Sequence, residues 1–151
     1  MIVTSILKTT ITMNYNNDEV LFNQIQIKLG VVDSLDNKRI IGRVIHVLRD
    51  QLSEEESEEI IQKLPVDLTM IYLTAWKVTP HRSSTYHLDE FVTRLLETDS
   101  IMPKKVFRTE IEALRASIIV LTELDKRYNL LDYLPGSIKN ELNNAMLNEA
   151  A

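Results

Sequence analysis

The residues of this chain that could carry out chemistry are three histidines, a cluster of glutamates and a small group of cations. His46, His81 and His87 do not form a zinc motif, because no two of them lie four residues apart on a helix. The chain has no cysteine, which excludes thiolate metal sites and cysteine nucleophiles. Glycine-rich phosphate loops and serine nucleophile elbows are also missing. We therefore expect no catalytic residue, no metal site and no cofactor.

The glutamate cluster and the basic group each have a simple structural explanation. Five glutamates fall between residues 54 and 59, where they point around one helix instead of converging on an ion. They follow Ser53 in a capping-box pattern, and carboxylates are stabilising near the positive end of a helix. Lys104, Lys105 and Arg108 could contact nucleic acid, but three cations neutralise few phosphates and the net charge is −5. A weak nucleic-acid-associated regulator is therefore only an alternative.

The most unusual stretch runs from Trp76 to His87 and has the proline and serine content of a loop. A lone tryptophan at the end of an apolar helix most often anchors the core, but Trp, His and Arg together are also typical of protein interfaces. We therefore predict a binding surface here. Its candidate residues are Trp76, Lys77, Pro80, His81, Arg82 and His87. The alternative is a metal- or anion-binding site, or an enzyme, that uses the two histidines with Asp89 or Glu90.

The composition is that of an ordinary globular protein. The chain has 151 residues, of which 44% are hydrophobic and 26% charged, enough for one compact domain without disulfides. Three glycines and four prolines are too few for the many tight turns of an all-β fold. No stretch approaches the roughly 18 consecutive apolar residues of a membrane span. The absence of cysteine fits a cytoplasmic protein.

Apolar residues recur at intervals of three and four, which predicts a single all-α domain of about eight helices over residues 17–151. Residues 1–16 are expected to be an extended or disordered extension, because β-branched residues recur through it. Pro65, Pro103 and Pro135 are expected at helix starts, where proline is favoured. A short helix is also expected over residues 125–133. On the second helix, Arg43, His46 and Arg49 are expected on a solvated face.

Two stretches of the chain align at an offset of 70 residues. Residues 60–65 and 130–135 each read two apolar residues, two polar residues and Leu-Pro. Further matches pair Leu68 and Tyr72 with Ile138 and Leu142, and Ile41, Val44 and Leu48 with Ile111, Leu114 and Ile118. Such a boundary can arise by chance, but matches on both sides at one offset favour duplication. We predict two related repeats, over about residues 36–76 and 104–148, with leading helices; two units are too few for a solenoid.

The order of these motifs resembles a bacterial family known as domain of unknown function 2267. In that family a long helix and a short acidic helix lead to Leu-Pro, then to Trp, Pro and an Asp-Glu-Phe run, and finally to a second Leu-Pro. The corresponding segments here are residues 44–53, Leu64-Pro65, Trp76, Pro80, residues 89–92 and Leu134-Pro135.

The resemblance covers about residues 18–148 and implies an all-helical tandem repeat, without any activity or catalytic residue. We therefore favour a helical interaction or adaptor module. Its partner would be an unidentified protein or a second copy of the chain.

Overall fold

The computed structural model describes residues 19–76, 85 and 87–150, so the predicted N-terminal extension lies outside it. These residues form seven α-helices and one 3-10 helix and contain no strand, which confirms the all-α class. The helices are residues 19–29, α2 (Ser34–Asp50), α3 (Glu54–Lys63), α4 (Val66–Leu73), α5 (Leu88–Ser100), α6 (Glu110–Tyr128), the 3-10 helix η1 (Leu130–Tyr133) and α7 (Gly136–Ala150). None of the helices in this part of the chain is long and apolar enough to cross a membrane. The cytoplasmic location stays a prediction.

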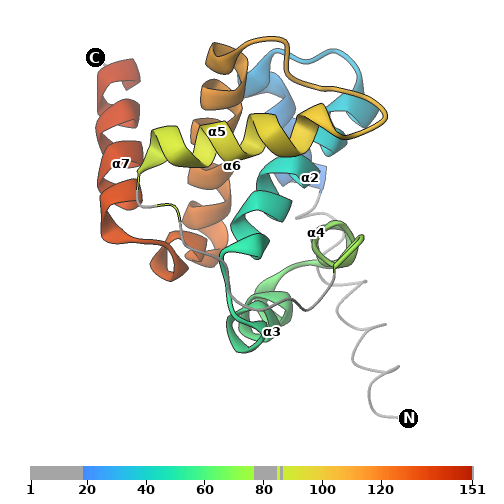
Figure 1. Ribbon diagram of the computed structural model, residues 1–151, viewed down its shortest axis with the longest axis vertical. Coiled ribbons are helices and arrows are strands. Elements are labelled where there is room, and N and C mark those ends of the chain that lie inside the picture. The colour runs from blue at the N-terminus through green and yellow to red at the C-terminus, as the bar shows by residue number, and fades with distance from the viewer. Residues whose placement is uncertain (1–18, 77–84, 86, 151) are drawn as a thin grey trace.

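Helix α2 lies at the centre of the fold, with α4, α5 and α6 packed against it (Figure 1). Because helices surround it, 10 of its 17 residues are buried. The prediction of a solvated face is therefore wrong for Arg43 and Arg49, whose exposed fractions are 8% and 7%. Both arginines have hydrogen-bond partners within the protein. His46 is half-buried, with its Nε2 atom 2.8 Å from the carbonyl oxygen of Ile71.

The hydrophobic core is continuous and draws on all the helices. The largest fully buried side chains are Leu21, Ile25, Ile41, Ile45, Leu48, Ile60, Leu68, Tyr72, Phe91, Leu95, Leu121 and Leu124, and α7 adds Ile138 and Leu142. Burying one large apolar side chain contributes about 1.5–3 kcal/mol. Because these residues belong to one cluster, the helices are held as a single body.

Helix α6 begins at Glu110, so the predicted start near Pro103 is wrong. Residues 101–109 instead form an irregular loop whose backbone is bonded to Asp99, the last buried residue of α5. Thr109 then caps α6, since its side chain accepts a hydrogen bond from the amide of Glu112 at 3.1 Å. The predicted helix over residues 125–133 is divided between the end of α6 and η1, because Asn129 takes a left-handed conformation with φ 55°.

The two Leu-Pro pairs occupy similar positions in the fold. Leu64 and Leu134 are both buried, and each proline directly precedes a helix, α4 or α7. The residues matched after the prolines are buried in both stretches: Leu68, Tyr72, Ile138 and Leu142. Before the prolines the match weakens, because Ile41 is fully buried whereas Ile111 is 76% exposed. The two-repeat organisation stays a prediction, supported mainly by the helices that follow each Leu-Pro.

Candidate functional site

Most of the surface predicted between Trp76 and His87 lies outside the described residues, namely Lys77, Pro80, His81 and Arg82. Trp76 is half-buried just beyond α4 and lies edge to face with Tyr72, with ring centroids 6.4 Å apart. Ala75, two residues beyond the end of α4, has a left-handed φ of 54°. Trp76 therefore packs against the core, which fits the anchoring explanation. Its role in binding stays a prediction.

His87 joins the start of α5 to α7. Its Nδ1 atom lies 2.7 Å from Oε1 of Glu141, and Oε2 of Glu141 accepts a hydrogen bond from the amide of Leu88 at 2.7 Å. This places a carboxylate at the positive end of α5. The hydrogen bond to Glu141 raises the pKa of His87, and the same bond lowers the pKa of Glu141. Within the described ranges, no three His, Asp or Glu side chains are grouped so that they could hold a metal ion.

The contact between His87 and Glu141 should depend on pH. The pKa of His87 is raised on folding, so its contribution to stability is present below the ordinary histidine pKa and is lost as pH rises through the folded value. The pKa of Glu141 is lowered, so its contribution is present above the ordinary glutamate pKa and is lost as pH falls through the folded value. In an NMR titration of the imidazole, Glu141→Gln should return the pKa of His87 toward 6.5. Glu97→Gln, an exposed control on α5, should not; an unchanged pKa in Glu141→Gln would contradict the contact.

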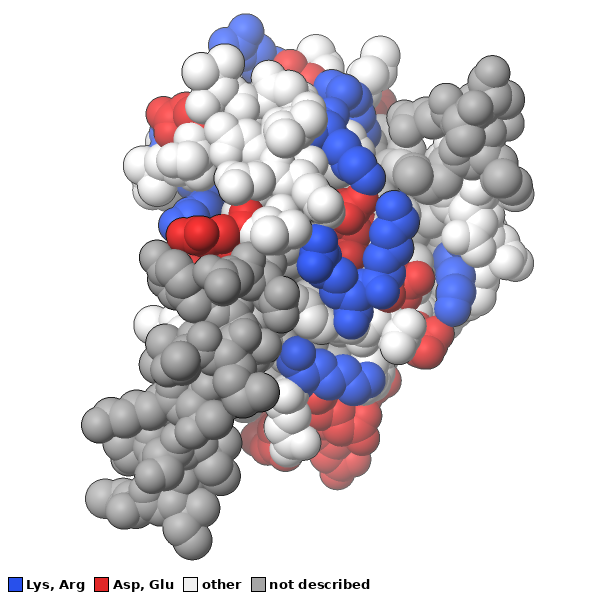
Figure 2. Space-filling model, turned by 180° about the vertical axis from the view of Figure 1, so that it is seen from behind, with Lys and Arg blue, Asp and Glu red and all other residues white. Residues whose placement is uncertain are grey.

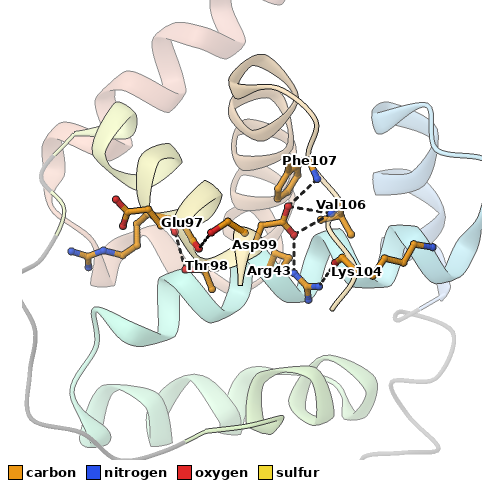
Figure 3. A network of polar contacts seen from close by, with 9 residues as sticks. Arg43, Glu97, Thr98, Asp99, Lys104, Val106 and Phe107 are labelled. Atoms are coloured by element: carbon orange, nitrogen blue, oxygen red, sulfur yellow. Dashed lines mark hydrogen bonds and ion pairs between the residues drawn. The ribbon is translucent and has the colours of Figure 1, made fainter. Parts of the chain in front are cut away.

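Asp99 is the buried centre of a polar network that ties α2, α5 and the 101–109 loop together (Figure 3). Its Oδ1 atom accepts a hydrogen bond from Nε of Arg43 at 3.1 Å. Its carboxylate also accepts from the amides of Val106 and Phe107, each at 3.1 Å. Arg43 further donates to the carbonyl oxygen of Lys104 at 2.9 Å, while the Lys104 side chain extends away from the network. The loop backbone is therefore fixed.

Beside this loop lies a cleft of about 540 Å³, a size within the range of small-molecule pockets. It is bordered by the end of helix 19–29, the first turns of α2, the loop and the first turns of α6. Its apolar lining consists of Leu29, Val31, Ile40, Val106, Phe107 and Ala116. Its charged lining consists of Lys104, Lys105, Arg108 and Arg115 with Asp36 and Glu112. Because cations outnumber carboxylates, we call it the basic cleft.

Two of the four cations in the basic cleft are already engaged. Nζ of Lys104 lies 3.1 Å from Oδ1 of Asp36. Arg115 donates to the carbonyl oxygens of Lys28 and Leu29, at 2.7 and 3.2 Å, and so satisfies the end of the first helix. The hydrogen bonds from Lys104 and Arg39 lower the pKa of Asp36.

The other two cations, Lys105 and Arg108, have exposed side chains that form no hydrogen bond or ion pair with any residue in the described part of the chain. Their positive charges therefore lie unpaired at the edge of a pocket that has both apolar and charged lining. The carboxylate of Glu112 accepts the backbone amide of Arg108 at 2.7 Å but forms no ion pair with the side chain of Lys105 or Arg108 in the described part of the chain. This combination of free charge and apolar surface is suited to an anionic partner that also has apolar groups.

A second hollow of about 370 Å³ lies farther along helix 19–29 and α6, two of the helices that border the basic cleft. Gln24, Ile27, Lys28, Glu123, Lys126 and Arg127 line it. Glu123 is only 3% exposed and is paired with Lys28 and Lys126. Burial alone would raise the pKa of Glu123, but the hydrogen bond from Lys28 and the charges of both lysines lower it overall. Seen from behind, the molecule shows Lys and Arg side chains grouped near the middle with a few acidic side chains among them, and further acidic side chains at the lower end (Figure 2).

The comparison with family models decides the classification. Residues 18–140 match the family described as "Uncharacterized conserved protein (DUF2267)". The chain belongs to the DUF2267 family. This confirms the resemblance inferred from the order of the Leu-Pro, Trp and acidic motifs. The part that matches the DUF2267 model contains the basic cleft and the Asp99 network. No curated protein is significantly similar to the chain.

The sequence predicted the basic group of this site but not the residues that hold it in place. It grouped Lys104, Lys105 and Arg108, although on a helix instead of a loop. It missed Asp99 and Arg115. A signal for Asp99 was present, because a carboxylate in the last turn of a helix is at the unfavourable end of the helix dipole and needs a compensating partner.

Proposed function

We propose that this DUF2267 protein is a helical interaction module that binds an acidic segment of a protein partner in the basic cleft. One observation carries the proposal: the two unpaired cations, Lys105 and Arg108, border a pocket that also has apolar lining. The apolar lining would add favourable burial wherever the partner also presents apolar groups. The two cations would select a partner with carboxylates and speed its encounter with the cleft.

The Asp99 network supports this function because it holds one wall of the cleft in place before binding. The loop that carries Lys105 and Arg108 has its backbone bonded to Asp99 and Arg43, which are both buried. A partner that binds a fixed surface does not have to order it, so less of the binding energy is lost. The predicted surface from Trp76 to His87 remains the alternative location. A role in binding nucleic acid is disfavoured by the small number of free cations.

A titration with a short fluorescent peptide of alternating leucine and glutamate pairs tests the proposal. We expect binding that weakens as salt is raised, because exposed charges are screened. Lys105→Glu combined with Arg108→Glu should weaken binding by about 100-fold, which corresponds to about 2.8 kcal/mol. Fluorescence anisotropy measures the affinity directly.

A matched control variant distinguishes the cleft from the general charge of the protein. Lys63→Glu combined with Lys139→Glu changes the net charge equally, and both lysines lie outside the cleft lining. Circular dichroism checks that this variant keeps the fold, because Lys139 is paired with Asp132 and Lys63 contacts Tyr133 in the wild type. This variant should keep its affinity within about threefold, since charges farther than about 10 Å are largely screened. The same peptide with glutamine in place of glutamate keeps only the apolar contacts and should bind about 100-fold more weakly. Equal losses in the two variants, or equal affinity for the glutamine peptide, would refute the proposal.

A further inference from the structure

We infer that the acidic segment which occupies the basic cleft is helix α3 of a second copy of this chain, so that the protein associates with itself head to tail. The inference rests on the proposed function, because it names the partner of the same cleft. Two surfaces of opposite charge carry it, and both are present in this one chain.

The acidic surface is the outer side of α3. Glu54, Glu55, Glu58 and Glu59 are exposed there, whereas Glu56 is engaged in the capping box with Ser53. Glu59 accepts a hydrogen bond from the hydroxyl of Tyr133 at 3.0 Å. Glu55 and Glu58 are three residues apart and so share a face of the helix. No hydrogen bond or ion pair joins either of them to a residue that the structure describes.

The basic cleft offers what these two carboxylates lack. Lys105 and Arg108 are exposed and uncompensated, and they border a pocket. Pairs of Lys or Arg with Glu across an interface fix the register of the two partners and disfavour partners of the wrong charge. Both surfaces are also held in shape before contact, α3 by its capping box and the loop by Asp99.

One chain cannot join its own two surfaces. The cleft is lined by Asp36 and Ile40 in the first turns of α2, whereas α3 follows the last turn of α2. A helix of 17 residues is about 25 Å long, so α2 separates the two surfaces within one molecule. Figure 1 shows α3 and the loop that leads into α6 at opposite sides of the fold. A second copy is therefore required to bring the charges together.

This contact joins different surfaces of the two copies, which has a consequence for the size of the assembly. Each added copy leaves one free cleft and one free α3, so growth continues into open chains unless the ends close into a ring. Exposed ion pairs contribute little individually, so the association should be weak and sensitive to salt.

Sedimentation velocity over a range of protein concentrations tests the inference. At low salt the average mass should rise with concentration and pass beyond that of a dimer. In about 1 M salt, where the screening length is about 3 Å, it should fall to that of the monomer. Two variants should each remain monomeric: Lys105→Glu with Arg108→Glu, and Glu55→Lys with Glu58→Lys. Circular dichroism checks that both retain the helical fold.

Mixing the two variants gives the decisive result. In the cleft variant both the cleft and α3 are negative, and in the α3 variant both are positive, so neither variant associates alone. In the mixture, the cleft of each variant is opposite in charge to the α3 of the other. An equal mixture should therefore regain the mass distribution of the wild type. A mixture that stays monomeric would overturn the inference. The inference would also be overturned if the cleft variant, Lys105→Glu with Arg108→Glu, assembled to the same average mass as the wild type.

The two proposals can fail separately. If the wild type stays monomeric at low salt while the leucine–glutamate peptide still binds in the cleft, the self-association is wrong and the proposed function stands. If neither the peptide nor a second copy binds, both are wrong. If either charge-reversed variant loses its fold, the neutral variant Lys105→Gln with Arg108→Gln replaces it. The average mass of this neutral variant at low salt should be lower than that of the wild type.

Discussion

Replacing Asp99 with alanine should lower the free energy of unfolding by about 3–5 kcal/mol, the cost of removing one partner from a buried ion pair. Asp99 is 2% exposed, and its partner Arg43 is 8% exposed. The substitution would leave the guanidinium of Arg43 buried without its counter-ion. It would also remove the acceptor of the amides of Val106 and Phe107. The 101–109 loop would then lose its hydrogen bonds to the side chain of Asp99.

Urea denaturation, followed by circular dichroism, measures this change. Glu97→Ala is the matched control, because it removes an exposed carboxylate from the same helix and should change stability by less than about 0.5 kcal/mol. Adding Arg43→Met to Asp99→Ala should recover part of the loss, since no unpaired charge then stays buried. A loss below about 1 kcal/mol in Asp99→Ala alone would show that the network does not hold the loop in solution. Asp99→Ala should also weaken peptide binding, because the cleft wall would no longer be fixed.

Tyr72→Ala should destabilise the fold by about 3–5 kcal/mol, the range for removing a large aromatic side chain from a core. Tyr72 is fully buried in α4, and its hydroxyl lies 2.6 Å from the hydroxyl of Ser57 in α3. Its ring also lies against Trp76. Tyr72→Phe removes only the hydroxyl bond and should cost about 1–2 kcal/mol. Thermal unfolding followed by Trp76 fluorescence compares the two variants; equal losses in both would contradict the importance of ring packing.

Burial raises the pKa of Tyr72 to about 12, above its ordinary value of 10.0. The folded state therefore holds this proton more tightly than the unfolded state. Its contribution to stability is present below pH 10.0 and is lost as pH rises toward about 12. Tyr72→Phe should therefore lose less stability than the wild type as pH rises from 10.0 toward about 12. This difference separates the contribution of Tyr72 from that of the lysines, which titrate in the same range and are present in both proteins.

The helices could be predicted where local sequence determines them. The spacing of Leu21 and Ile25 indicates a buried stripe, and Ser53 with Glu56 forms the expected capping box. The start of α6 could not be predicted in this way. Proline is tolerated in loops as well as at helix starts, and the loop that follows Pro103 is held by contacts between elements distant in sequence. Asp99 and Arg43, for example, are 56 residues apart.

The candidate site could be predicted only where its residues are close in sequence. Lys104, Lys105 and Arg108 are close in sequence and were visible as a basic group. The cleft they border also requires Arg115 to contact Leu29, 86 residues away, which no local pattern encodes. Arg43 and Arg49 were expected on a solvated face because charge usually marks solvent exposure. Their burial depends on partners supplied by other helices.

The most direct test of the basic cleft is to map the binding of the leucine–glutamate peptide by NMR, with the amide and tryptophan indole signals of the labelled protein. We expect the largest shifts during the titration at Gly30, Val31 and residues 104–108, which line the cleft. Signals near Trp76 and His87 should change little. If the shifts instead cluster at the Trp76 indole and His87 while the cleft signals stay constant, the basic cleft is not the binding site.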